Sequence, residues 1–279
     1  MNRKWKIAGI IGGILLFSGM GYETVHAQTL TGKQAQQEID TFISTARQDK
    51  SGVVDFRAVN AQQKKGGSKE SSKDRGTIKY AGDNTENIHG YTQQDGKVME
   101  MNVFTNGHDV FAQQPNQRFI PNNDALDEVH KLYDNYKINS LQLQMLDALK
   151  KYATVNRHGN TETITVRLTK KNNAAIQKIM WAGMEKGKTK QLIIKYTVDV
   201  HTHQPLTCYW KTQNYETKGD MANTMTWTTA HDKFSNQNKQ GSIPMPAADQ
   251  IDRTIKAVIR ESDKLQALKN TVMEGRHQF

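Results

Sequence analysis

Cysteine, proline and long apolar runs are scarce in this chain of 279 residues. Cys208 is the one cysteine, so no disulfide can form within the chain and the fold must be held by packing. No apolar run reaches the roughly 20 residues that a spanning helix needs, which excludes a polytopic membrane protein. Hydrophobic residues still make up 36% of the chain, enough for a buried core and too many for general disorder.

The first residues show the three regions of a secretory signal peptide. Residues 2–6 are basic, residues 7–17 are apolar, and Val25-His26-Ala27 is a small-x-small cleavage pattern. We predict that residues 1–27 are a signal peptide and that the protein is extracellular or attached to the cell surface. An N-terminal membrane anchor is the alternative, because the same basic flank would orient an uncleaved segment.

Acidic side chains are outnumbered, with 28 Asp and Glu against 38 Lys and Arg. Removing residues 1–27 takes away Arg3, Lys4, Lys6 and Glu23 and leaves a net charge of +8 on the exported part. Such a charge attracts an anionic cell-wall polymer or a membrane surface, and salt screens the attraction over about 8 Å at physiological strength. Because the chain is exported and has no nucleic-acid-binding signature, we expect no nucleic acid as a partner.

Hydrophobic periodicity in the first half predicts one helix followed by a meander of strands. Residues 32–48 place apolar side chains at helical spacing, and residues 53–59 are rich in strand formers. The run from Gln62 to Arg75 is rich in Lys, Gly and Ser and predicts a solvated loop. Short strands are expected at 77–81, 87–92, 98–104 and 109–113, with Asp95-Gly96 and Asn106-Gly107 as primed turns between them.

The second half predicts helices, a hairpin and three long strands. The helices are expected at 125–136, 141–152 and 172–184, the hairpin at 154–168, and the long strands at 189–200, 206–215 and 221–234. Ile243-Pro244-Met245-Pro246 marks the end of the sheet. From Ala247 a 3-4 repeat predicts an amphipathic C-terminal helix, which packs on the domain, pairs with another copy or meets a membrane; the oligomeric state stays open.

Three features carry a resemblance to a known family. They are the turn Asp199 to Pro205 between Tyr196 and Trp210, the segment from Gly107 to Phe119, and Ile243-Pro244. The chain resembles exported, usually lipid-anchored proteins of Gram-positive bacteria in the half-barrel superfamily of the lipoprotein carriers (LolA, LppX and LprG-like). Met20 stands where the lipid-bearing cysteine of such proteins would be, so we expect no acylation there.

The resemblance implies an α+β fold: a curved antiparallel β-sheet half-barrel with helices on the concave face, plus an appended C-terminal helix. The half-barrel domain would span residues 28–246, with residues 247–279 as C-terminal amphipathic helix and tail. In the carriers the concavity takes acyl chains, so a lipid or other amphiphile is the implied ligand. The side chains expected to line such a cavity are Met99, Met101, Trp210, Met221, Met225 and Trp227, although the same six fit an ordinary core.

Catalytic and metal-binding patterns are weak. His201-x-His203 lacks a third ligand, and Cys208 lies within a predicted strand, where a small buried hydrophobe is the usual role. We therefore predict a protein that is not an enzyme and has no cofactor or metal. Two functions stay open: a binding protein that shelters an amphiphile, and a cell-envelope interaction protein that contacts anionic wall polymers or a protein partner through its basic surface or C-terminal helix.

Overall fold

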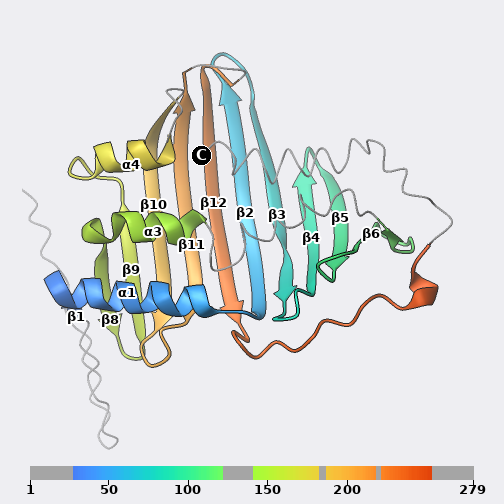
Figure 1. Ribbon diagram of the computed structural model, residues 1–279. Helices are drawn as coiled ribbons and strands as arrows, with labels where there is room; N and C mark the ends of the chain where they lie inside the picture. Colours follow the sequence, from blue (N-terminus) through green and yellow to red (C-terminus); the bar gives the residue numbers. More distant parts are fainter. Residues whose placement is uncertain (1–27, 122–140, 182–186, 218–220, 253–279) are drawn as a thin grey trace, which may run out of the picture.

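The computed structural model describes residues 28–121, 141–181, 187–217 and 221–252 (Figure 1). The predicted signal peptide, the helix expected at 125–136 and most of the expected C-terminal helix lie outside these residues. Within the described ranges, no helix is both long and apolar enough to cross a membrane. The elements are β1 (Gln28–Leu30), α1 (Gly32–Gln48), β2 (Gly52–Lys64), β3 (Lys69–Tyr80), β4 (Glu86–Gln94), β5 (Lys97–Thr105), β6 (Val110–Gln113), β7 (Ile120–Pro121), α3 (Leu141–Leu149), η2 (Lys150–Tyr152), β8 (Thr154–His158), β9 (Thr161–Arg167), α4 (Asn173–Met180), β10 (Gly187–Asp199), β11 (Pro205–Glu216), β12 (Thr224–Ser235) and η3 (Ala248–Gln250).

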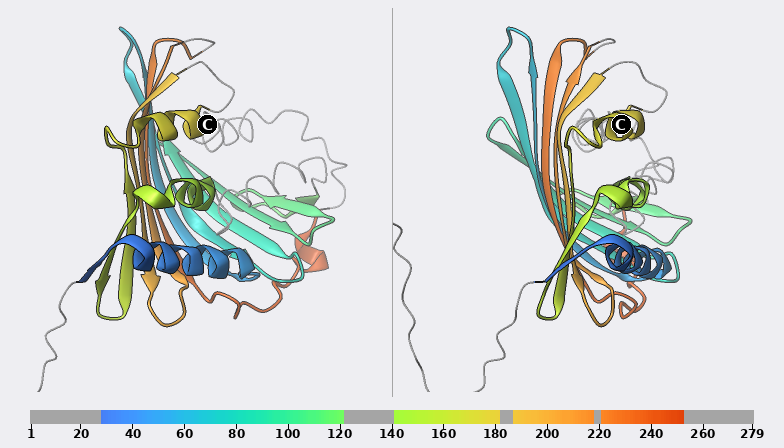
Figure 2. Two further views of the ribbon diagram at one scale, coloured as in Figure 1. Left: turned by 60° about the vertical axis from the view of Figure 1, so that its left-hand side comes forward. Right: turned by 90° about the vertical axis from the view of Figure 1, so that its left-hand side faces the viewer.

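The strands form a single 12-stranded sheet in the order β1-β8-β9-β10-β11-β12-β2-β3-β4-β5-β6-β7. All neighbouring strands in this order pair antiparallel, from β1 with β8 to β6 with β7. The sheet is twisted and curved, and α1, α3 and α4 lie on its concave face over the half that runs from β8 to β11 (Figures 1 and 2). The predicted fold class, a curved antiparallel half-barrel with helices on the concave face, is confirmed.

Alternation along each strand divides the sheet into an inner, concave face and an outer, convex face. On β10 the inward positions Leu192, Ile194 and Tyr196 are buried, and they meet buried side chains from all three helices. Phe42 of α1 packs on Tyr196 with their ring centroids 5.0 Å apart. Helices therefore form in the three ranges where apolar stripes predict them, 32–48, 141–152 and 172–184. The last of them, α4, extends to Met180.

The loop predicted from Gln62 to Arg75 is wrong, because β2 and β3 continue through it and leave only residues 65–68 as a turn. Its Lys and Ser residues alternate: Ser72 and Asp74 face inward and are buried, whereas Lys73 and Arg75 face outward and are exposed. The backbone of β3 pairs on both sides, with β2 and with β4, so ladder hydrogen bonds stabilise a segment of low strand propensity.

The two predicted primed turns have different outcomes. Asp95 and Gly96 both have positive φ, 50° and 74°, and join β4 to β5 as a two-residue turn. Asn106 and Gly107 instead begin a four-residue loop, because Thr105 pairs with Val110. The Asn106 side chain accepts hydrogen bonds from the backbone N–H groups of His108 and Asp109, and this local bonding favours the wider loop.

Helix α4 is fixed to the sheet at a β-bulge in β10. The side-chain amide of Gln177 donates to the backbone oxygen of Thr189 at 2.8 Å and accepts from its N–H at 2.9 Å. The Trp181 ring lies over Gly187, where an added Cβ would come within 2.1 Å of the indole. Because a Cβ cannot approach so closely, glycine at 187 is required for the indole to lie against β10.

A second, smaller hydrophobic cluster closes the β6 end of the sheet. Ile243 and Ile251 pack there with Phe104, Phe111 and Phe119. The Phe119 N–H donates to the Gln250 oxygen at 2.7 Å, and the Asp252 N–H donates to the Phe119 oxygen at 2.8 Å. Residues 248–250 form one turn of 3₁₀-helix and Ile251 forms a parallel bridge, so the chain is not yet α-helical where the C-terminal helix was expected to begin.

An ion-pair network joins α1 to the β8–β9 hairpin. Arg157 donates to Glu162, whose side chain is only 1% exposed, through Nε at 2.7 Å, and to Glu38 of α1 at 3.0 Å. A carboxylate so far from water depends on its partner, since removing one member of a buried pair leaves an uncompensated charge.

Replacing Arg157 with Gln should lower the free energy of unfolding by about 2–3 kcal/mol, because Glu162 loses its cation in a buried position. Urea denaturation at neutral pH measures the change. Arg47→Gln is the matched control: it removes the Arg47–Asp147 pair, in which the arginine is 49% exposed, and should cost less than about 1 kcal/mol. Equal losses in the two variants would contradict the assigned role of Arg157.

Candidate functional site

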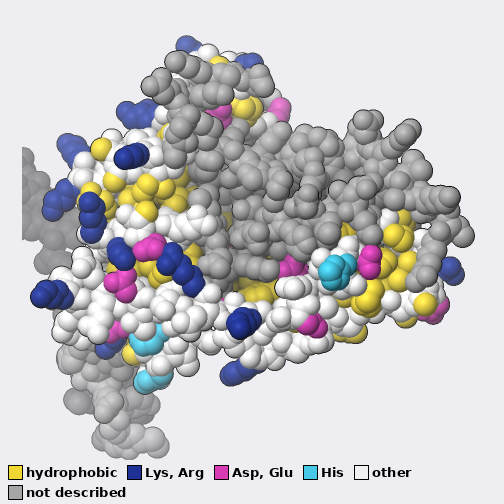
Figure 3. All heavy atoms as spheres, in the orientation of Figure 1, with side chains coloured by type: hydrophobic (Ala, Val, Ile, Leu, Met, Phe, Trp, Pro, Cys, Tyr) yellow, Lys and Arg dark blue, Asp and Glu magenta, His cyan; other side chains and the backbone are white. Residues whose placement is uncertain are grey.

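The inner face of β2–β5 lies beyond the half of the sheet that α3 and α4 cover, and it carries an apolar floor (Figure 1). Hydrophobic side chains show between polar ones in the space-filling view of this side (Figure 3). In the strand register Val54, Ile78, Ile88 and Val103 form one row across the four strands. All four side chains are at least 96% removed from solvent, and Met101 of β5 packs beside them.

Two glycines shape the middle of this floor. Gly76 and Gly90 lie opposite each other on β3 and β4, and the tip of the Phe56 ring lies above them. A Cβ on Gly76 would come within 2.8 Å of Phe56 Cζ and 2.3 Å of the His89 oxygen. The missing side chains therefore let the tip of the Phe56 ring approach the backbone of β3 and β4 more closely than a Cβ would allow.

A polar band borders the floor on the same face. The register places Thr228, Asn60 and Ser72 in one cross-strand row. Asp74 and Thr92 belong to the next row, which lies between that row and the floor. Asn60 donates to the Asp74 carboxylate at 2.9 Å. The buried side-chain oxygens of Asn60 and of Asn214 on β11 accept no hydrogen bond from any residue that the structure describes. Buried acceptors normally have partners, so each of these oxygens can accept a hydrogen bond from a ligand.

The six side chains predicted to line a cavity do not all share a face. Met99, Met101 and Trp210 face inward, and Met99 lies in the same cross-strand row as Trp210 but five strands away, about 24 Å at the usual strand spacing. Met225 and Trp227 face outward, opposite Tyr215 and Gln213 of β11, and Lys69 lies over the Trp227 ring at 4.9 Å. Met221 lies in the turn before β12.

A polar group on the outer face of β4 and β5 was not predicted. His89 Nε2 lies 2.8 Å from Glu100 Oε1 and 3.2 Å from the Tyr91 hydroxyl, beside a cleft of about 220 Å³ that Asn102 and Gln113 also line. The hydrogen bond from His89 holds the pKa of the Glu100 carboxyl below its ordinary value. The Asp95-Gly96 turn was a usable signal, because a two-residue turn there sets Tyr91 opposite Glu100.

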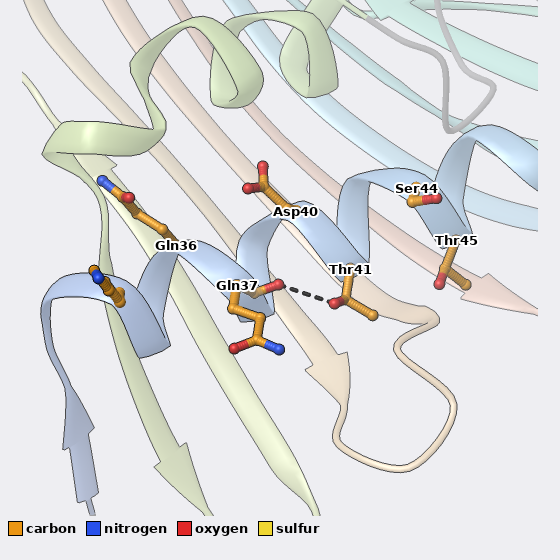
Figure 4. A pocket seen from close by; sticks show the side chains of 7 residues that line it. Gln36, Gln37, Asp40, Thr41, Ser44 and Thr45 are labelled. Carbon is orange, nitrogen blue, oxygen red and sulfur yellow. Dashed lines mark hydrogen bonds between the residues drawn. The ribbon is translucent and has the colours of Figure 1, made fainter.

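A second depression of about 520 Å³ lies along α1 (Figure 4). Its side chains come from α1 alone, and Thr41 donates its hydroxyl to the Gln37 backbone oxygen at 2.9 Å. It is polar and open, with no group converging from another element, and it carries no chemistry that would select a ligand.

The histidines and the cysteine considered for chemistry lie apart. His201 is exposed in the β10–β11 turn, whereas His203 approaches Glu38 at 3.7 Å. Cys208 is 2% exposed in the inward-facing core, as expected of a small hydrophobe. Among the described residues, no group of three His, Cys, Asp or Glu side chains is placed to hold a metal ion.

The Glu100 carboxyl should titrate below its ordinary pKa of about 4.3. Because folding lowers the pKa of Glu100, its contact with His89 stabilises the fold at pH values above the ordinary pKa. This stabilisation is lost as the pH falls through the pKa of the folded state. Carbon-13 NMR of the carboxyl measures the pKa directly. His89→Val should raise it toward 4.3, about the ordinary value, while His108→Val, at an exposed position elsewhere, should leave it unchanged.

No family model and no curated protein matches this chain. Among solved structures, LprF from Mycobacterium bovis has a TM-score of 0.38 at 11% identity, covering 77% of this chain and 98% of that one. Lipoprotein LppX from Mycobacterium tuberculosis has a TM-score of 0.36 at 9% identity, covering 77% and 100%. A LolA superfamily protein from Nitrosomonas europaea has a TM-score of 0.26 at 7% identity, covering 75% and 94%.

Proposed function

We propose that this protein is an exported, non-catalytic binding protein that shelters an amphiphilic ligand, such as a lipid, against the concave face of β2–β5. One observation carries the proposal: this face is divided into an apolar floor and an adjoining polar band. An amphiphile has the same division, so its chain and its head group can be matched at once.

The floor supplies the driving force for the apolar part. Met99 and Met101 are partly exposed and offer hydrocarbon surface to a ligand. They continue the buried row of Ile78, Ile88 and Val103, and the Phe56 ring lies over the two glycines beside it. Each methylene of a ligand that leaves water here contributes about 0.8 kcal/mol. Met99 and Met101 are deformable side chains suited to ligands of differing shape.

The polar band supplies the selectivity. Asn60 offers a buried carbonyl oxygen to which no described residue donates, and Ser72 and Thr92 add hydroxyl groups on the same face. A head group that donates hydrogen bonds, such as a polyol, would satisfy Asn60 and remove the cost of leaving it unpaired.

Native mass spectrometry of protein purified from its own host tests the proposal directly. A copurifying amphiphile that is released by organic solvent is the expected result. Protein that carries no such molecule and binds no amphiphilic probe after delipidation would refute it.

Met101→Asp should weaken binding of a dansyl-labelled fatty acid at least about tenfold, because a carboxylate on the floor must be desolvated against the acyl chain. Fluorescence titration measures the affinity, and thermal unfolding confirms that the variant is folded. Val98→Asp places the same charge on the outer face of the same strand, at a position 61% exposed, and should leave the affinity unchanged. If both variants bind like the parent, the concave face is not the binding site.

A further inference from the structure

The convex face of the sheet from β10 to β4 is basic, and no described helix lies over it (Figure 2). The segment that carries Ile243 and Ile251 packs on this face only at its β5–β6 end. On β11, β12, β2 and β3, all of which are described in full, the outward positions include Lys211, Lys233, Arg57, Lys73 and Arg75. Asp55 is the one outward carboxylate on these strands. We propose that this face binds a flexible anionic phosphodiester polymer of the cell envelope.

The cations are aligned across the strands, at right angles to the chain direction. The strand register sets one continuous outward row, in the order Lys195, Tyr209, His231, Arg57, Arg75, Tyr91. Neighbouring positions in such a row are separated by the strand spacing of about 4.8 Å. A linear polyanion laid along the row would therefore meet positive charge and aromatic rings in turn.

The acidic groups of this face are already engaged. Asp55 accepts a hydrogen bond from the Thr77 hydroxyl at 2.7 Å, and Glu100, at the end of the row on β5, is paired with His89. Arg57, Arg75 and Lys195 are exposed, and none of them forms an ion pair with a described carboxylate. Their charge is therefore not balanced within the described chain.

Arg57 and Arg75 are directly opposite each other on adjacent strands. Like charges in opposed positions destabilise a sheet, so packing gives no reason for this pair. A bound phosphate between two strands would relieve the repulsion and accept hydrogen bonds from both guanidinium groups.

Aromatic rings accompany the cations. The Arg75 guanidinium lies 5.3 Å from the centre of the Tyr91 ring, and the Tyr209 and His231 rings are 4.7 Å apart. Tyr91 and Tyr209 are partly exposed and His231 is exposed, so these rings give the carbon-rich units between phosphates a surface to contact.

The curvature favours a flexible polymer over a nucleic-acid duplex. A rigid duplex is itself convex and would touch this convex face along a narrow line, whereas a flexible chain follows the surface. Attraction of this kind should depend strongly on salt, because binding releases the counterions of the polymer. The proposal does not rest on ligand binding to the concave face, because the two faces use alternate residues of the same strands.

The test measures binding of purified poly(glycerol phosphate) to the protein by calorimetry at rising salt. We expect an affinity that falls steeply between about 50 and about 200 mM NaCl. The double variant Arg57→Gln with Arg75→Gln should weaken binding at least about tenfold and flatten the salt dependence, because two phosphate contacts are lost. Thermal unfolding should show no loss of stability, since the variant removes a like-charge pair.

Lys170→Gln with Lys171→Gln is the matched control, because it removes the same net charge from exposed residues in the turn that leads into α4. It should leave the affinity close to that of the parent. Equal weakening in both double variants would mean that net charge alone acts, and would overturn the site. Tighter binding of a DNA duplex than of the polymer would overturn the choice of partner. Binding of the fatty-acid probe should be the same in all variants, which separates this test from that of the concave face.

Discussion

The antiparallel pairing of β12 with β2 is the interaction on which the rest of the structure depends. It joins strands separated by most of the chain, from Thr224 opposite Lys64 to Ser235 opposite Val53. On one side lie the strands that the helices cover, and on the other the meander β2–β7. Without this ladder there would be two smaller sheets, and neither the continuous concave face nor the cross-strand rows would exist. Contacts so distant in sequence cost loop entropy, which the long run of ladder hydrogen bonds must offset.

The sheet curves between the half that the described helices cover and the half formed by β2–β7 (Figure 2). Residues without side chains allow this where strands are crowded: Gly76 and Gly90 accept the Phe56 ring, and Gly187 accepts Trp181. The turn after α1 is fixed by Asp49, which accepts a hydrogen bond from the Tyr80 hydroxyl at 2.7 Å and one from the Asn238 N–H at 3.1 Å. Burial raises the pKa of Asp49 despite these hydrogen bonds. The same few residues thus connect the end of α1 to β3 and to the segment that leaves β12.

Local sequence patterns predicted most of the elements, but only where side-chain periodicity reflects local packing. The helical stripes at 32–48 and 141–152 were visible because one face of each helix is apolar. The Lys-rich part of β3 was missed because its strand state comes from pairing with two neighbours, and its inward side chains, Ser72 and Asp74, are polar. Composition alone describes such a segment as a loop.

The same limit applies to the candidate sites. Met225 and Trp227 share a face with each other, as alternation predicts, but which face that is depends on the pairing of β12 with β11 across a turn whose geometry the sequence does not determine. Where a turn type is certain, register follows: Asp95-Gly96 places Tyr91 opposite Glu100 without any structure. The residues that face each other in a cross-strand row can therefore be predicted one pair of strands at a time, and only where the type of the turn between the two strands can be predicted.

Alternation also makes the two faces of each central strand independent in composition. On β3 the inward Ser72, Asp74 and Ile78 carry the polar band and the floor, while the outward Lys73 and Arg75 carry the basic row. A substitution on one face leaves the other chemically unchanged, but both depend on the same backbone hydrogen bonds. A ligand on the concave face and a polymer on the convex face would thus contact different side chains and still stabilise the same sheet, so that each could raise the protein's resistance to unfolding without competing for space.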